Sequence, residues 1–197
     1  LSSISGEHYK NYNVNRLIRR SNGIDLYYGD KSEFFSYDKV VLASHADQAL
    51  SIIDEPTKDE QEILSKFKYR ENIAVIHTDE SIMPNNKDIW SSWNSSVDKN
   101  NVEKNSITYW LNLLQNLDFN KNIFLTLNPN FKINENKILK KVNFTHPYFD
   151  QSALDNQDKL KNLQNKKNLL FCGSYFGYGF HEDGIKSSIE MIKAIDD

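Results

Sequence analysis

The stretch FCGSYFGYGFHEDGIKSS, Phe171–Ser188, joins an apolar segment to a pattern typical of a helix. Four of the chain's seven glycines lie in this stretch, next to aromatic residues and the cluster His181, Glu182 and Asp183. The residues that precede the turn, NLLFCG (168–173), contain the apolar run Leu169–Cys172, as in a strand buried on both faces. Isoleucine then recurs at helical spacing over 182–195. The stretch therefore predicts a buried strand, a glycine-shaped turn and the N-terminus of a closing helix.

This construction is suited to binding an anion or a polar ring. The first N–H groups of a helix have no partner within the helix, and the positive end of its dipole lies behind them. Glycine lets a ligand approach the backbone because no Cβ intervenes. We expect Gly173 to end the strand, Gly177 and Gly179 to shape the turn, and Gly184 to lie in the first helical turn. The alternative is a tight, capped turn without a ligand.

The N-terminal part of the chain alternates strand and helix patterns. Residues 12–28 predict a β-hairpin around Asn-Gly, and 37–44 predict a strand buried on both faces. A helix follows from about residue 46 and ends before Pro56, and a second helix covers about 58–66. Thr57 and Glu60 form a capping-box pair at the start of that second helix.

From about residue 70 the pattern is mainly β. Strand patterns separated by polar turns recur at 72–79, 89–96, 106–114, 122–128 and 138–147. Short connections between successive strands favour an antiparallel sheet. A helix over 150–165 follows, and in the closing helix we expect Ile185, Ile189, Ile192 and Ile195 to face inward. The fold class is therefore α/β at both ends and antiparallel β between them, or α+β overall.

Composition narrows the functional classes. The formal net charge of −3 provides no field that would recruit nucleic acid or an anionic membrane. The sequence contains neither a long apolar run nor a signal-peptide pattern, so we expect a cytoplasmic location and no integral membrane segment. The single cysteine, Cys172, excludes an internal disulfide and is expected to be a small buried hydrophobe.

Three stretches resemble the C-terminal half of a family of bacterial proteins. They are YDKVVLASHADQAL from residue 37, AVIHTDESIMPNNKDIWSSWN from residue 74, and LLFCGSYFGYGFHEDGIKSS from residue 169. In this order they resemble FAD-dependent oxidoreductases, the predicted NAD/FAD-binding proteins related to flavin-containing amine oxidases and phytoene desaturases. The resemblance covers roughly residues 10–197.

The resemblance implies a discontinuous architecture and a cofactor site. It implies that 1–69 and 148–197 are parts of a Rossmann-like FAD-binding domain, with 70–147 part of a mainly antiparallel β substrate domain. The FAD-binding residues that it implies are Ala43, Gly173, Ser174, Phe180, His181, Glu182, Asp183 and Gly184. The backbone at 181–184 would face the pyrimidine edge of the flavin, and Tyr175 and Tyr178 would line the substrate cavity.

The resemblance also defines what is missing. The family's N-terminal GxGxxG strand–turn–helix, with the acidic residue that holds the adenosine ribose, has no counterpart in this sequence. A chain that begins at Leu1 is therefore expected to be the C-terminal part of a protein about twice as long.

The predicted function is an amine-oxidase-like, FAD-dependent oxidoreductase that transfers hydride from a small-molecule substrate to flavin. No catalytic acid or base is identified. Two alternatives remain. One is a flavin-dependent desaturase or isomerase of a lipid-like substrate, and the other is a non-catalytic interaction protein that has kept the scaffold.

Other polar and aromatic residues have structural interpretations. His77 and Asp79 are expected to form a hydrogen-bonded pair at a domain junction, and His45 either borders the cofactor or caps a helix. No metal site is expected, because the adjacent side chains at 181–183 diverge around a helix. The tryptophans are expected in the core or at an interface of the substrate domain; they are Trp90, Trp93 and Trp110.

Overall fold

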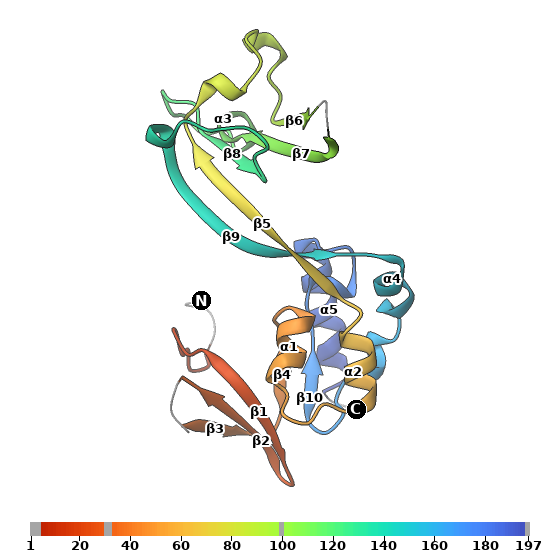
Figure 1. The fold of residues 1–197 in the computed structure, drawn as a ribbon. Coiled ribbons are helices and arrows are strands. Elements are labelled where there is room, and N and C mark those ends of the chain that lie inside the picture. The colour runs from red at the N-terminus through yellow and green to blue at the C-terminus, as the bar shows by residue number, and fades with distance from the viewer. Residues whose placement is uncertain (1–4, 30–32, 99–100, 196–197) are drawn as a thin grey trace. The chain divides into compact units, whose positions relative to one another are not determined.

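The chain folds into two compact units (Figure 1). The first unit consists of residues 1–69 and 147–197, and the second consists of residues 70–146. The structure is a computed structural model, and it describes residues 5–29, 33–98 and 101–195. None of the described helices is both long enough and apolar enough to cross a membrane.

The first unit contains two small sheets and most of the helices. An antiparallel sheet is formed by β1 (Val14–Arg20), β2 (Gly23–Tyr28) and β3 (Phe34–Tyr37). A parallel pair is formed by β4 (Val40–Leu42) and β10 (Leu169–Phe171). The helical elements are α1 (Ala46–Ile52), α2 (Lys58–Leu64), α4 (Gln151–Gln157), the 3-10 turns η4 (Leu160–Leu163) and η5 (Ser174–Phe176), and α5 (His181–Lys193).

The parallel pair is the central layer of this unit. Leu169 and Phe171 point into the main core, which also contains buried residues of α1, α2 and η4. On the opposite face, Leu170 and Cys172 pack against Met191 of α5. Side chains therefore cover β10 on both faces, which explains the continuous apolar run in this segment.

Two helices begin where the capping signals place them or close by. Thr57 and Glu60 form the expected capping box of α2, with the Glu60 N–H donating to Thr57 Oγ1 at 3.3 Å and the Thr57 N–H donating to Glu60 Oε2 at 2.7 Å. α1 begins at Ala46, as expected. In the hairpin, Gly23 pairs with Arg20, so the turn consists of residues 21–22 and Gly23 belongs to the strand.

Two helix predictions are wrong in detail. The helix expected over 150–165 ends at Gln157 and continues as η4. In α5, the expected inward face is wrong for three of the four isoleucines, because Ser187 and Met191 are the buried residues. Ile195 is half-buried and packs against the cluster of Leu170, Cys172 and Met191, as expected. Small side chains on that face let the helix lie close to β10, where Ser187 Oγ accepts from the Gly173 N–H at 2.9 Å. The isoleucines on the other face are exposed by 57%, 53% and 55% at Ile185, Ile189 and Ile192.

The second unit is built on a five-stranded sheet in the order β6-β7-β8-β5-β9. The pairs of β6 with β7, β7 with β8 and β8 with β5 are antiparallel. The strands are β5 (Lys68–His77), β6 (Trp93–Asp98), β7 (Asn101–Trp110), β8 (Phe124–Leu127) and β9 (Ile138–Tyr148). The short helical elements are η1 (Glu80–Ile82), η2 (Lys87–Ile89), α3 (Leu111–Leu114) and η3 (Glu135–Lys137).

Several strand boundaries in this unit differ from the sequence prediction. β5 begins at Lys68 and β7 at Asn101, before the predicted starts at 72 and 106. The strand expected over 89–96 begins only at Trp93, after η2. The strand expected over 106–114 ends at Trp110, and α3 follows it directly. Short helical elements, η2 and α3, take up part of each of these two predicted strands.

The sheet of the second unit buries polar residues and leaves an apolar face more open. Register places Thr108, Thr126 and Val75 side by side, and all three are buried. The residues between them along β7 and β8 point to the opposite face. There Ile107, Leu125, Leu127 and Tyr109 are half-buried, and Trp93 next to Tyr109 is 62% exposed. The buried face therefore mixes the two threonines with Val75 and Phe124, whereas the opposite face is apolar and only half-buried on β7 and β8.

Candidate functional site

The carboxyl ends of β4 and β10 lie next to each other. Phe171 pairs with Leu42 in parallel register, and the Cys172 N–H donates to the Leu42 carbonyl at 3.2 Å. Beyond this pair, Ala43 and Ser44 are exposed. A Cβ added to Gly173 would lie 3.5 Å from the Ser44 carbonyl oxygen. The two strands thus end in one exposed position, where ligands of open α/β sheets commonly bind.

Gly173 has a conformation and surroundings that admit only glycine. Its φ is +157°, and an added Cβ would lie 2.7 Å from Cε1 of the Tyr175 ring. Tyr175 itself is 2% exposed and belongs to the main core, where it contacts Phe67 and Phe176. Burial raises the pKa of the Tyr175 phenol far above its usual range. Tyr175 therefore occupies a core position in this unit rather than the wall of an open cavity.

The turn between β10 and α5 is held by one carboxylate. Asp183 Oδ2 accepts from the N–H groups of Tyr178 and Phe180, each at 3.0 Å. A Cβ on Gly177 would lie 2.5 Å from Asp183 Cγ, so glycine makes room for this carboxylate. Asp183 is therefore occupied in fixing the turn and the start of the helix.

The N-terminus of α5 presents main-chain donors to solvent. The N–H groups of Asp183 and Gly184 donate to the Phe180 carbonyl. Within the described part of the chain, no acceptor faces the N–H groups of His181 and Glu182, and both side chains are exposed. Gly184 lies next to Ser174, since its added Cβ would be 3.8 Å from the Ser174 nitrogen.

These positions form what we call the strand-end site. It comprises Ala43, Ser44, Gly173, Ser174 and the main chain of 181–184. The exposed rings of Tyr178 and Phe180 flank the helix start, each 69% exposed. Such a site offers glycine-lined backbone and free N–H groups rather than acidic or basic catalysts.

His45 and Cys172 border the strand-end site but are held by packing. The His45 ring stacks on Tyr69 with centroids 4.1 Å apart, and the Tyr69 hydroxyl accepts from the Ala46 N–H at 2.8 Å. Cys172 is buried against α5. Among the residues that the structure describes, no three His, Cys, Asp or Glu side chains converge as metal ligands.

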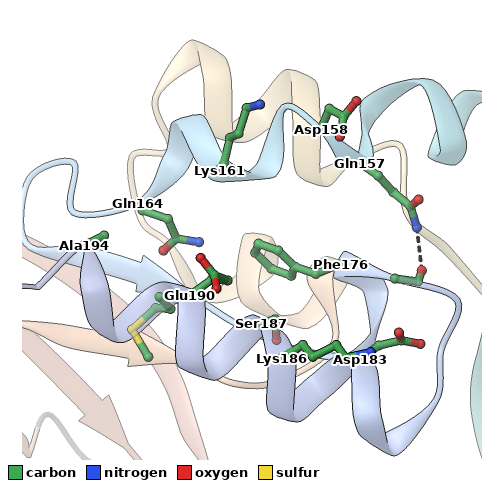
Figure 2. Close-up of a pocket in the computed structure, with 12 residues that line it drawn as sticks. Gln157, Asp158, Lys161, Gln164, Phe176, Asp183, Lys186, Ser187, Glu190 and Ala194 are labelled. Carbon is green, nitrogen blue, oxygen red and sulfur yellow. Dashed lines mark hydrogen bonds between the residues drawn. The ribbon is translucent and has the colours of Figure 1, made fainter.

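A cavity of about 460 Å³ lies between η4 and α5 (Figure 2). Phe176, Met191 and Ala194 give it apolar walls, and Gln164 and Ser187 reach it from opposite sides. Sequence reasoning missed both polar residues. The spacing of Gly184, Ser187 and Ser188 signals a close helix contact, whereas Gln164 lay hidden in an expected helix.

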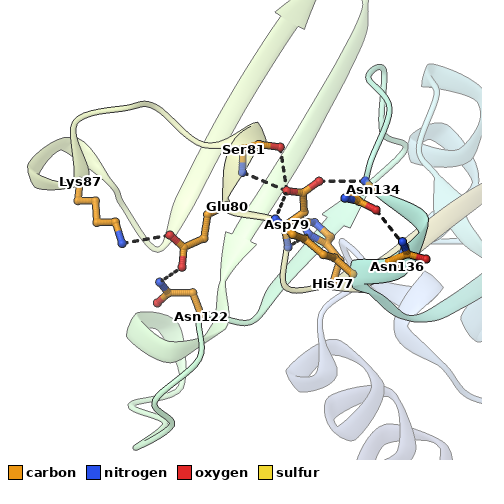
Figure 3. A network of polar contacts seen from close by, with 9 residues as sticks. His77, Asp79, Glu80, Ser81, Lys87, Asn122, Asn134 and Asn136 are labelled. Atoms are coloured by element: carbon orange, nitrogen blue, oxygen red, sulfur yellow. Dashed lines mark hydrogen bonds and ion pairs between the residues drawn. The ribbon is translucent and has the colours of Figure 1, made fainter.

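The second unit contains a buried polar network (Figure 3). The Asp79 N–H donates to His77 Nδ1 at 3.2 Å, and His77 Nε2 lies 2.9 Å from Thr126 Oγ1. Because Nδ1 accepts, Nε2 carries the proton of the neutral ring and donates to Thr126. Thr126 Oγ1 in turn lies 2.9 Å from Thr108 Oγ1. The expected His77–Asp79 pair thus exists, but through the main chain of Asp79.

Charge in this network is concentrated on the Asp79 carboxylate. Burial alone would raise the pKa of this carboxylate. Hydrogen bonds from the Asn134 N–H and from Ser81 lower the pKa, and so does the Lys137 ammonium group at 3.2 Å. The resulting pKa of Asp79 lies well below the usual range for an aspartate. Burial lowers the pKa of His77. The network holds a neutral histidine and a charged aspartate, and both are satisfied by partners on the same unit.

The fold of the chain is shared by several enzymes of known structure. The CLA-producing fatty acid isomerase from P. acnes aligns with a TM-score of 0.64 and 16% identity over 98% of this chain. A putrescine oxidase redesigned in its cofactor binding aligns with a TM-score of 0.61 and 9% identity over 95% of this chain. Cyclohexylamine oxidase from Brevibacterium oxydans aligns with a TM-score of 0.57 and 10% identity over 94% of this chain.

The chain spans about half the length of these proteins, 49% of each of the three. No protein-family model matches the chain, and no curated protein matches it in sequence. At these identities the comparisons show a common fold, a mixture of helices with antiparallel sheets.

Proposed function

We propose that the chain is the C-terminal portion of an FAD-dependent, amine-oxidase-like oxidoreductase in which a substrate passes hydride to the flavin. The observation that carries the proposal is the strand-end site, where two parallel strands end beside the first N–H groups of α5, those of His181 and Glu182, for which the described residues provide no acceptor. The shared fold supports it, because the matched structures include oxidases and one described by its cofactor binding.

The residues present fit the flavin end of FAD. Main-chain N–H groups at His181 and Glu182 would hydrogen-bond an electron-rich ring edge, and the α5 dipole would stabilise negative charge there. Gly173 and Ser174 would let the cofactor approach the backbone. Flavin supplies the hydride acceptor when it is bound, so this chain's role is orientation and electrostatics.

The other end of FAD needs residues that this sequence does not contain. No GxGxxG occurs in it. We therefore propose that polypeptide outside these 197 residues binds the adenosine diphosphate, and that the isolated chain binds FAD weakly. The first unit would be part of the FAD-binding domain, and the second would be part of the substrate domain.

The open face of the second unit favours a lipid-like substrate as the second candidate. The half-buried residues of β7 and β8 on this face are Ile107, Tyr109, Leu125 and Leu127, and none of them is charged. An amine cation would find no counter-charge among them, whereas an acyl chain would bury apolar surface. A desaturase or isomerase reaction is compatible with the same scaffold. Tyr178 of the first unit, whose ring is exposed, stays a proposed substrate-cavity residue by itself.

A pair of variants at one position tests the flavin contact. His181→Pro removes the first N–H of α5, and proline is tolerated at that helix position. Phe180 already has extended backbone, with φ −84° and ψ 158°, as a residue before proline requires. We expect His181→Pro to weaken FAD binding about tenfold, the loss of one hydrogen bond to a charged group. His181→Ala keeps the N–H and should bind FAD like the wild type.

The measurement is a titration of the purified protein with FAD, followed by flavin absorbance and fluorescence. Equal weakening by both variants would assign the effect to the imidazole and contradict the main-chain role. No flavin signal after reconstitution, in this chain or in a longer polypeptide that contains it, would favour the non-catalytic interaction protein. Anaerobic bleaching of bound flavin by an amine or by a fatty acid would separate the two substrate classes.

A further inference from the structure

The helix α5 carries an apolar ridge on the side that faces away from the cavity. The ridge consists of Ile185, Ile189 and Ile192, and each of these side chains is more than half exposed. Their spacing of four and three residues places them in one stripe along the helix. In the described part of the chain, none of the three lines the cavity or belongs to a buried cluster. Contiguous apolar surface of this kind is typical of protein–protein contacts.

Charged side chains form a row along one side of this ridge. Glu182, Lys186 and Lys193 follow one another at intervals of four and seven residues, which places them on the same flank of the helix. The row is therefore acidic at the start of α5 and basic at its end. Glu182 pairs with Lys186 at 3.8 Å and Lys193 pairs with Glu190 at 2.6 Å, yet the side chains of Glu182 and Lys193 are each 65% exposed. Both end groups can thus meet a further partner.

A ridge with opposite charges at its two ends is complementary to a reversed copy of itself. In an antiparallel pair of helices related by a two-fold axis, Ile189 meets its own copy, and Ile185 meets Ile192 of the second copy. The same axis places Glu182 of each copy beside Lys193 of the other, so the charge pair forms twice. A parallel pair would bring like charges together at both ends and would align the two helix dipoles unfavourably. The charge pattern therefore favours a second copy in the antiparallel orientation.

We propose that the ridge of α5 mediates reversible association of two copies of this chain, with their α5 helices antiparallel. Burial of the isoleucines provides the affinity, and the pairs of Glu182 with Lys193 of the second copy set the orientation. Three isoleucines per copy bury less surface than the ~1,200 Å² of a small stable interface, so the dimer is weak. The inference goes beyond the proposed function, because no flavin takes part in the contact.

Two charge reversals and their mixture test the proposal on the chain as it exists. Glu182→Lys makes both ends of the row basic, and Lys193→Glu makes both ends acidic. Each variant alone should dimerise about threefold to tenfold more weakly than the wild type, because both interchain pairs become repulsive. An equimolar mixture of the two variants should recover the wild-type association, because each basic end then meets an acidic one. Sedimentation velocity over a concentration series up to the millimolar range measures the dissociation constants.

Matched changes on another helix control for net charge. Glu62→Lys and Lys58→Glu make the same two charge changes at exposed side chains of α2, and they should associate like the wild type, alone and mixed. Circular dichroism of the α5 variants checks that the helix is retained, because both reversals oppose its dipole. If a reversal unfolds the helix, Glu182→Gln and Lys193→Gln replace it. They remove the charges without reversing them and should still weaken the association.

Several results would overturn the proposal. They are a wild-type chain that stays monomeric at the highest concentration, charge variants of α5 with an unchanged dissociation constant, or a mixture that associates no more tightly than its components. Equal weakening by the α2 reversals would assign the effect to net charge. A longer polypeptide that contains this chain could also stay monomeric and lose thermal stability through Ile189→Lys. The ridge would then be covered within that polypeptide, and the second copy would be the wrong occupant.

Discussion

Gly173 and Gly184 both border the strand-end site, but their surroundings differ. A Cβ on Gly173 would overlap the buried Tyr175 ring at 2.7 Å, whereas one on Gly184 would meet only the Ser174 nitrogen at 3.8 Å. We expect Gly173→Ala to lower the free energy of unfolding by about 2–4 kcal/mol, because the core is overpacked and the backbone is strained. Gly184→Ala should raise it by about 0.5–1 kcal/mol, since alanine favours the helix.

Urea denaturation of both variants, followed by far-UV circular dichroism, measures this difference. Equal effects of the two substitutions would mean that the tight contact between Gly173 and Tyr175 does not exist. The comparison is matched, because each variant adds one methyl group at a glycine of the same strand-to-helix connection.

His77 makes the stability of the second unit depend on pH. Burial lowers the pKa of its imidazole, so the unfolded chain binds a proton near pH 6.5 before the folded chain does. The stabilisation that the neutral His77 contributes is complete above pH 6.5. It is lost as the pH falls toward the lower pKa that His77 has in the folded protein. The free energy of unfolding should drop by at most about 1.4 kcal/mol per pH unit in that window.

The matched variant for this prediction is His77→Gln, which cannot titrate. Its free energy of unfolding should be lower than that of the wild type at pH 7.5 and should change less between pH 7 and 5. Tryptophan fluorescence in urea reports the transition, because Phe124 contacts both His77 and Trp90. Parallel pH profiles of the two proteins would assign the dependence to other groups.

At the scale of one element, α5 has an inner face and an uncovered apolar ridge. Met191 is 6% exposed and Ile189 is 53% exposed. Ile189→Lys should therefore change the free energy of unfolding by less than about 0.5 kcal/mol and reduce self-association of the chain. Met191→Lys should cost about 3 kcal/mol or more, since it buries an unpaired charge.

Thermal denaturation and sedimentation velocity of the two variants check this orientation. A large loss of stability in Ile189→Lys would restore the isoleucine face as the inner one. The sequence pattern could not decide the question by itself. Its periodicity is helical for both faces, and the choice depends on Ser187, a polar residue that is buried because it bonds Gly173.

Elements with a local signal were predictable, and those that depend on distant partners were not. The α2 capping box is local, since Thr57 and Glu60 bond each other across three residues. The break after Gln157 has no comparable signal. Gln157 donates to the carbonyl of Gly177, twenty residues away, and that contact is visible only in the folded chain.

At the scale of the whole molecule, the tryptophans and most helices report on different units. All three tryptophans, Trp90, Trp93 and Trp110, lie within residues 70–146, whereas α1, α2, α4 and α5 belong to the other unit. The core cluster of Met83, Trp90 and Phe124 is small compared with the main core of the first unit. We expect fluorescence to show unfolding at a lower urea concentration than circular dichroism at 222 nm.

A common midpoint for the two signals would instead show that the units unfold as one cooperative body. The two signals need no added label, because both are intrinsic to the protein. Each signal arises mainly from one unit, so the two midpoints report on the two units separately. Trp90→Phe is a useful control, since it should lower the fluorescence amplitude while leaving the dichroism midpoint in place.

The candidate site was partly predictable for the same physical reason as the fold. Glycine content marks the turn from Gly173 to Gly184, because few other residues satisfy its backbone. The sequence could not show that the Asp183 carboxylate accepts hydrogen bonds from the main chain of the turn, or that Tyr175 is buried. Both depend on contacts that form only when the turn closes over the strand.

The buried position of Cys172 gives the molecule a built-in chemical reporter. Its thiol packs under α5 against Leu170 and Met191, so a thiol reagent can reach it only when that helix lifts from β10. The labelling rate under native conditions should therefore give the free energy of this local opening. Cys172 therefore reports the docking of α5 on β10 without an engineered reporter.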